Sequence, residues 1–182
     1  MKKNILLFFL IFILASYAAT YGLQAEKLPS PFIIIPEPQS VILLNGQGLE
    51  PGLLQHLILK GEFNRPVMGD LLSQLTIGEL AGKGTLSLIL DKTITSPSSE
   101  EGYVMTSYKD RVEVISKGEA GLFYGCQSLE QLLEDARDNK KPVPSCKITD
   151  YPVLPYRAIH FDLKHHLDHM NYYYESIDSL AR

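Results

Sequence analysis

The chain has 182 residues, of which 45% are hydrophobic and 21% are charged, and its formal net charge is −4. This composition is typical of a folded, mostly globular protein. The acidic balance and the lack of a basic patch argue against nucleic acid as a partner.

The first 18 residues have the parts of a secretory signal peptide. Two lysines precede an apolar run from Ile5 to Ala15, and Ser16-Tyr17-Ala18 offers the small residues of a cleavage site. The apolar run is too short for a membrane span. We predict removal of residues 1–18, a periplasmic or extracellular location, and contact with a membrane only through this segment. A retained N-terminal anchor is the alternative.

The next part of the chain alternates apolar runs with one helical pattern. Phe32 to Ile35, Val41 to Leu44, Leu57 to Lys60 and Thr85 to Leu90 are predicted strands. Pro66 to Leu80 is a predicted helix, because its apolar residues recur at helical spacing and proline suits a first turn. Glycines follow its end.

A hairpin and a longer helix come next. Tyr103 to Tyr108 and Val112 to Ser116 alternate around a polar turn, which predicts a β-hairpin. From Leu122 to Ala136 the apolar residues form one stripe with charged residues off it, which predicts an amphipathic helix. Val143 to Ile148 is predicted to be a last strand or an extended link.

These elements do not alternate strictly between strand and helix. The order favours an α+β fold, with a mostly antiparallel sheet and two helices on one face. We assign residues 19–149 to this domain. Its two cysteines, Cys126 and Cys146, could pair in an oxidising compartment or could be buried, unpaired small hydrophobic residues.

Residues 150–182 have a different character. Two prolines, at positions 152 and 155, hold the backbone extended, and Arg157 to Leu163 is a predicted strand. One helix-like segment follows. In an α/β barrel, functional residues lie at the C-terminal end of such a strand. The pattern predicts an incomplete first β/α unit of a TIM-type barrel, and hence a truncated protein or a fragment.

Three motifs resemble those of one family. They are IPEP at 35–38, GLFYGCQSLEQL at 121–132, and DYP at 150–152 followed by YRAIHFD at 156–162. In this order they resemble the I-P-x-P opening, the G-L-F-Y-G-x-Q-T-L-x-Q-L helix and the D-x-P, Y-R-G, L-D barrel entry of glycoside hydrolase family 20, the β-N-acetylhexosaminidases. Each motif is weak alone, but together and in this order they are a strong signal.

The resemblance implies a secreted enzyme that acts on terminal N-acetylhexosamine residues of glycans without a cofactor. It also implies that Arg157, the arginine of Y-R-G, binds hydroxyls of the non-reducing sugar through its fork of donors. An ion pair, with Asp162 as a candidate partner, is the alternative role. The sequence departs from the family at Ala158, where glycine is usual, at His165, usually arginine, and at Leu167, usually phenylalanine.

The catalytic residues that the resemblance implies do not occur in this sequence. Family members use an adjacent Asp-Glu pair on a later barrel strand: the glutamic acid protonates the glycosidic oxygen, and the aspartate orients the substrate's own acetamido group. After Asp162 the acidic residues are Asp168, Glu175 and Asp178. The adjacent acids Glu100-Glu101 lie in a Ser/Pro-rich loop and are expected to be solvated.

Two classes of function therefore stay open. The first is the N-terminal portion of a β-N-acetylhexosaminidase, inactive as this fragment. The second is a stand-alone, non-catalytic module that binds glycans or packs against another protein.

A cluster of four histidines could suggest a metal site. His160, His165, His166 and His169 are residues that zinc accepts, but their order matches no standard zinc spacing, so we expect a polar loop and no metal.

The aromatic pair Phe123 and Tyr124 could stack on a sugar. Glycines flank the pair, and we favour packing, because Gly121 and Gly125 would let the helix lie close against the sheet.

Overall fold

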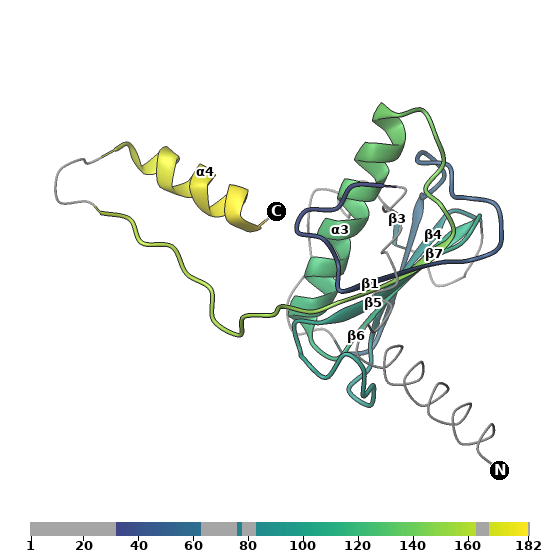
Figure 1. Ribbon diagram of the computed structural model, residues 1–182, viewed down its shortest axis with the longest axis horizontal. Coiled ribbons are helices and arrows are strands. Elements are labelled where there is room, and N and C mark those ends of the chain that lie inside the picture. Colours follow the sequence, from purple (N-terminus) through teal and green to yellow (C-terminus); the bar gives the residue numbers. More distant parts are fainter. Residues whose placement is uncertain (1–31, 63–75, 78–82, 163–167, 182) are drawn as a thin grey trace, which may run out of the picture. The chain divides into compact units, whose positions relative to one another are not determined.

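A seven-stranded sheet and one long helix form the body of the computed structural model, which describes residues 32–62, 76–77, 83–162 and 168–181 (Figure 1). The strands follow the order β1-β7-β5-β6-β4-β2-β3 across the sheet. Their bounds are Ser40–Leu43 (β1), His56–Lys60 (β2), Thr76–Ile77 (β3), Thr85–Leu90 (β4), Tyr103–Ser107 (β5), Arg111–Ser116 (β6) and Cys146–Asp150 (β7). The described helices are Glu119–Asp138 (α3) and Met170–Ala181 (α4).

The sheet is mixed. The pairs β1·β7, β7·β5 and β5·β6 are antiparallel, whereas β6·β4, β4·β2 and β2·β3 are parallel. The predicted hairpin is confirmed as β5 and β6, and its second strand lies beside β4. The α+β class is thus confirmed, and the expected antiparallel pairing holds for the half of the sheet that contains the hairpin.

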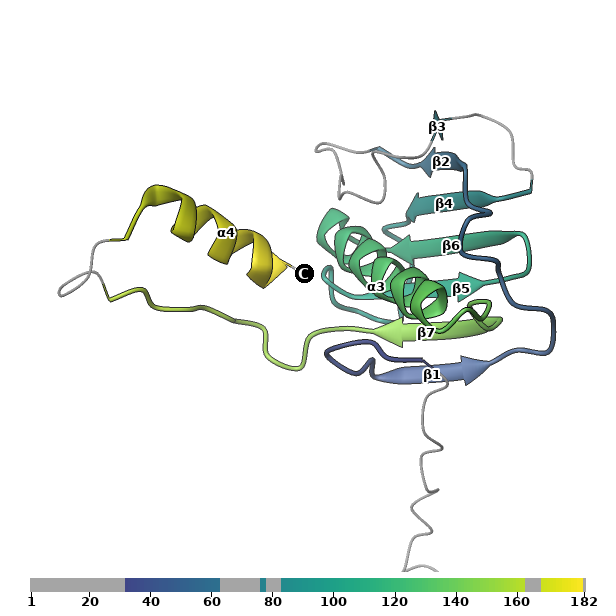
Figure 2. The same ribbon diagram turned by 90° about the horizontal axis from the view of Figure 1, so that it is seen from above.

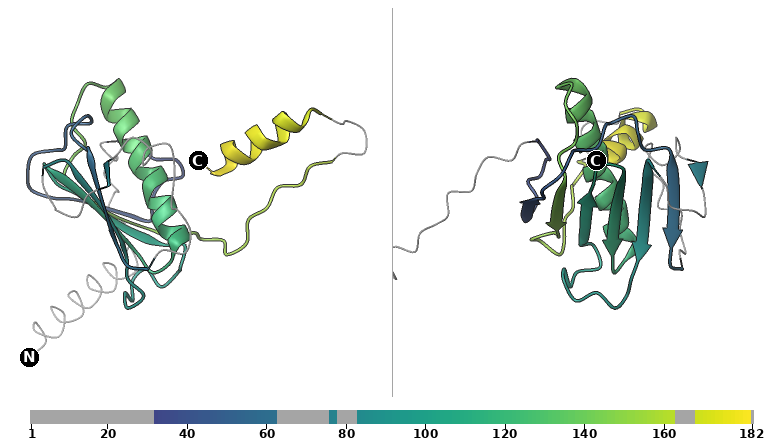
Figure 3. Two further views of the ribbon diagram at one scale, coloured as in Figure 1. Left: turned by 180° about the vertical axis from the view of Figure 1, so that it is seen from behind. Right: turned by 90° about the vertical axis from the view of Figure 1, so that its right-hand side faces the viewer.

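Helix α3 lies across one face of the sheet (Figures 2 and 3). The apolar stripe predicted between Leu122 and Ala136 is fully buried and packs on side chains of β4, β5 and β6, including Leu88, Met105 and Val114. Two glycines permit this close approach. A Cβ atom on Gly121 would lie 2.1 Å from Ser116 Oγ, and one on Gly125 would lie 2.4 Å from Val114 Cγ1.

The cysteines are unpaired. Cys126 on α3 and Cys146 on β7 are both buried and free. Burial raises the pKa of Cys126 to about 12 and also raises the pKa of Cys146. Both thiols therefore stay protonated near neutral pH, and they serve as small hydrophobic residues of the core.

Two predictions in the N-terminal half need correction. Phe32 to Ile35 is not a strand, because the Gln131 side chain on α3 takes the backbone groups of Ile35: Ile35 N–H donates to Gln131 Oε1 at 2.8 Å, and Gln131 Nε2 donates to Ile35 O at 3.1 Å. The helix predicted from Pro66 to Leu80 lies largely outside the described residues, but Thr76–Ile77 within it are strand β3. This helix and α3 were the two helices expected on one face of the sheet, so α3 is the one that the described residues confirm.

The predicted strand from Arg157 to Leu163 is wrong for its described residues, 157–162, which have no regular secondary structure. A strand needs a neighbour for its backbone N–H and C=O groups, and no described strand pairs with this segment. The helix expected after it is confirmed as α4. Within the described part of the chain, neither helix combines the length and apolar character that crossing a bilayer requires.

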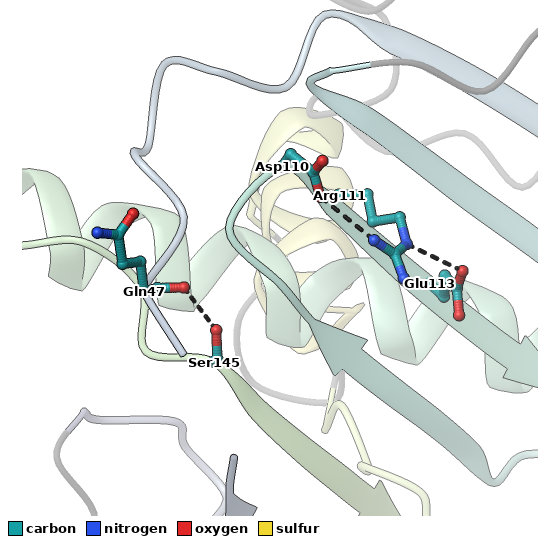
Figure 4. A network of polar contacts seen from close by, with 5 residues as sticks. All are labelled: Gln47, Asp110, Arg111, Glu113 and Ser145. Atoms are coloured by element: carbon teal, nitrogen blue, oxygen red, sulfur yellow. Dashed lines mark hydrogen bonds and ion pairs between the residues drawn. The ribbon is translucent and has the colours of Figure 1, made fainter. Parts of the chain in front are cut away.

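A polar network closes the hairpin end of the sheet (Figure 4). Arg111 pairs with Asp110 at 3.3 Å and with Glu113 at 3.4 Å, and its guanidinium carbon lies 4.0 Å from the centroid of the Tyr108 ring. Ser145 Oγ donates to Gln47 O at 2.6 Å, which ties the loop after β1 to the start of β7. These contacts join residues close to the turns, and their role is to hold the loops in place.

Candidate functional site

A pocket of about 470 Å³ lies at the end of the sheet away from the hairpin turn, where β5 begins and β7 ends. Its walls come from α3, the segment from Ile34 to Gln39, the start of β5 with the loop before it, and the linker that follows Asp150, together with Leu180 of α4. All three motifs that carry the family resemblance contribute to these walls. The pocket is therefore the place in the described structure where the motif residues meet.

Most polar groups of the pocket already have partners within the domain. The Asp150 carboxylate accepts a hydrogen bond from Gln39 N–H at 3.1 Å, and Tyr103 Oη lies 2.6 Å from Ser128 Oγ. Burial raises the pKa of the Tyr103 hydroxyl well above its usual value. Together with the Gln131–Ile35 pair, these contacts fix the walls of the pocket.

Arg157 is the candidate site residue, and the structure places it against the domain. It forms an ion pair with Glu101, and its Nη2 lies 3.5 Å from Tyr124 Oη. Its guanidinium carbon lies 5.9 Å from the centroid of the Tyr124 ring, and Nη1 donates to Leu154 O at 2.7 Å. The hydrogen bond with Glu101 and that with Tyr124 raise the pKa of Arg157 further, so it stays charged.

The partner of Arg157 differs from the sequence-based expectation. The sequence offers Asp162 as the partner of Arg157 and indicates a solvated Glu101, but in the structure Glu101 forms the ion pair. Its side chain is 36% exposed, because the loop places it beside α3 and the linker. Sequence spacing gives no signal for this pair, since the two residues are 56 positions apart.

The two neighbouring aromatic residues on α3, Phe123 and Tyr124, have different surroundings. Phe123 packs against the core, and its ring meets that of Tyr124 edge-on with centroids 5.6 Å apart. Tyr124 is 36% exposed and lines the pocket. Phe123 therefore has the packing role expected from the sequence, whereas Tyr124 contacts Arg157.

The histidines do not form a site within the described structure. His160 and His169 are exposed, whereas His165 and His166 lie outside the described residues. Among the described residues, no three side chains of His, Cys, Asp or Glu come together in a way that could hold a metal ion.

Comparison with known proteins agrees with the motifs. Residues 32–151 match the family described as Glycosyl hydrolase family 20, domain 2. Over 117 residues the chain is 36% identical to the beta-hexosaminidase of Porphyromonas gingivalis, a match that covers 56% of this chain and 15% of that protein.

Solved structures show the same fold. The N-acetyl-beta-hexosaminidase of Streptomyces plicatus aligns with a TM-score of 0.62 at 25% identity, over 81% of this chain and 32% of that one. The chitobiase of Flavobacterium johnsoniae aligns with a TM-score of 0.59 at 15% identity, over 81% of this chain and 25% of that one. The chain thus spans between 15% and 32% of the length of these three proteins.

Proposed function

Because the chain belongs to glycoside hydrolase family 20, whose domain 2 it matches over residues 32–151, we propose that it is the N-terminal portion of a secreted β-N-acetylhexosaminidase. Its substrates are glycans that carry terminal N-acetylhexosamine residues. The observation that carries this proposal is the family match across the sheet and α3. The similar protein from Porphyromonas gingivalis is a beta-hexosaminidase, which supports the same activity.

The role of the sheet domain, which ends at Asp150, is structural. The domain fixes the start of the linker through β7, whose last residue, Asp150, pairs with Tyr103 of β5. The linker then leads to the segment that resembles the entry into the catalytic barrel. Residues 1–18 are the proposed export signal, which delivers the protein to the periplasm or the cell exterior.

Arg157 is the proposed sugar-binding residue of this portion. Its guanidinium offers five N–H donors in a planar fork, which suits neighbouring sugar hydroxyls. Glu101 and Tyr124 are acceptors for this fork in the structure, so sugar oxygens would replace them or share the group with them.

We expect the 182-residue chain alone to leave aryl N-acetyl-β-glucosaminides intact, because it lacks an adjacent Asp-Glu pair on a barrel strand. The measurement is release of the aryl group by the purified, folded chain. A mock preparation from the same host serves as the control. Turnover that copurifies with the chain and disappears on mutation of one of its own residues would refute the proposal that this portion is inactive.

A further inference from the structure

The linker that leaves β7 returns to the domain at Arg157. The last residue of β7, Asp150, pairs with Tyr103, the first residue of β5. Glu101 lies just before that strand, so the loop before β5 and the linker after β7 meet at the same end of the sheet. The ion pair between Arg157 and Glu101 closes the linker back onto this loop.

The loop that carries Glu101 is held from several sides. Glu101 N–H donates to Ser99 Oγ at 3.2 Å, and Gly102 N–H donates to Ser99 O at 3.1 Å. Gly102 O accepts the hydroxyl of Ser116 at 2.7 Å, which ties the loop to the end of β6. Gly121 N–H donates to Glu100 O at 3.2 Å, which ties it to the start of α3. The Glu101 carboxylate therefore extends from a fixed backbone.

Tyr124 completes the surroundings of Arg157. It lies on α3 one turn after the close contact at Gly121, and its ring meets that of Phe123, which packs on the core. Its hydroxyl oxygen lies 3.5 Å from Arg157 Nη2, and the centroid of its ring lies 5.9 Å from the guanidinium carbon. Two residues of the domain thus converge on one side chain of the linker.

Apolar burial does little to hold the linker. Val153 is 75% exposed, Leu154 is 63% exposed and Tyr156 is 82% exposed. Nη1 of Arg157 also donates to Leu154 O at 2.7 Å, so the same side chain fixes the local turn of the linker. We propose that Glu101 and Tyr124 form a clasp that holds Arg157 and thereby fixes the course of the linker from Tyr151 to Tyr156.

The clasp does not depend on the proposed sugar role of Arg157, and it can be tested in the 182-residue chain. Trypsin must take up the Arg157 side chain before it can cut the bond to Ala158, so the clasp slows this cleavage. We expect Glu101→Gln to raise the initial rate of cleavage after Arg157 about two- to fivefold, the range that an exposed ion pair supports. Mass spectrometry of the fragments measures the rate.

Glu100→Gln is the matched control, because it removes the same charge from the neighbouring, exposed residue and leaves the ion pair in place. We expect it to cut at the wild-type rate. Tyr124→Phe keeps the ring and removes the hydroxyl, and we expect a smaller increase than for Glu101→Gln. Equal unfolding midpoints would show that all three variants are folded.

A second measurement does not use a protease. The steady-state heteronuclear NOE of the Arg157 side-chain Nε–H reports how rigidly the guanidinium is held, and it should fall in Glu101→Gln but not in Glu100→Gln. A cleavage rate and an NOE that are the same in Glu101→Gln as in the wild type would overturn the clasp. So would equal effects of the two glutamate substitutions.

Discussion

Gly121→Ala is expected to destabilise the domain by about 2–3 kcal/mol, the range for an overpacked contact plus a disturbed hydrogen bond. The added Cβ would lie 2.1 Å from Ser116 Oγ and 2.3 Å from Gly102 O. The carbonyl belongs to the backbone and cannot move aside as a side chain can. The two atoms are also hydrogen-bonded to each other at 2.7 Å, so relief of one contact strains the other. Urea unfolding of the 182-residue chain measures the change.

Gly52→Ala provides the control for this experiment. A Cβ on Gly52 would have no heavy atom within 4 Å, so we expect its free energy of unfolding to stay within about 0.5 kcal/mol of the wild type. If Gly121→Ala were as stable as Gly52→Ala, α3 could not lie as close to the sheet as the structure places it.

Arg157→Lys is expected to lower kcat/KM about ten- to hundredfold in a complete enzyme that carries this domain and its catalytic barrel. Lysine keeps the charge but loses the planar fork, so paired contacts to sugar hydroxyls become single ones. A hydrogen bond from a charged donor contributes about 1.5–3 kcal/mol, which corresponds to this loss of efficiency. Hydrolysis of an aryl N-acetyl-β-glucosaminide over a range of concentrations gives the value.

The matched control is Arg111→Lys. Arg111 lies at the hairpin end of the sheet with Asp110 and Glu113, away from the pocket, so the same chemical change there should leave kcat/KM unaltered. Normal efficiency and normal inhibition by N-acetylglucosamine analogues in Arg157→Lys would show that this arginine does not bind the sugar.

Local patterns predicted the elements that have a single clear period. The strand from Thr85 to Leu90 has the predicted bounds, and α3 extends the predicted helix by only a few residues at each end. The parallel half of the sheet could not be predicted in this way. An apolar run shows that a strand is buried, but it does not show which strand lies beside it or in which direction.

The two incorrect strands fail for a related reason. Phe32 to Ile35 and Arg157 to Leu163 both have strand-like composition, but a strand also needs a neighbouring backbone. The backbone of Ile35 instead forms hydrogen bonds with the side chain of Gln131. In the second segment, the described residues 157–162 pair with no described strand. Propensity alone does not supply the partner.

The candidate site was only partly predictable. The resemblance to the Y-R-G motif predicts Arg157 as a site residue, whereas only the fold shows that Glu101 and Tyr124 are its partners. Glu101 reaches Arg157 because β5 and β7 are neighbours in the sheet, and Tyr124 does so because Gly121 and Gly125 let α3 lie close to β5 and β6. These are long-range consequences of strand order and helix approach, which spacing along the chain does not encode.

We propose that residues 32–151, which match domain 2 of glycoside hydrolase family 20, belong to a larger, secreted β-N-acetylhexosaminidase. The most direct test is to capture the native protein from its source with an antibody against this domain, sequence it by mass spectrometry and assay it with an aryl N-acetyl-β-glucosaminide. We predict an exported polypeptide that continues beyond Arg182, contains an adjacent Asp-Glu pair and hydrolyses the substrate. A captured protein that ends at Arg182 and has no such activity would show that this domain does not belong to a β-N-acetylhexosaminidase.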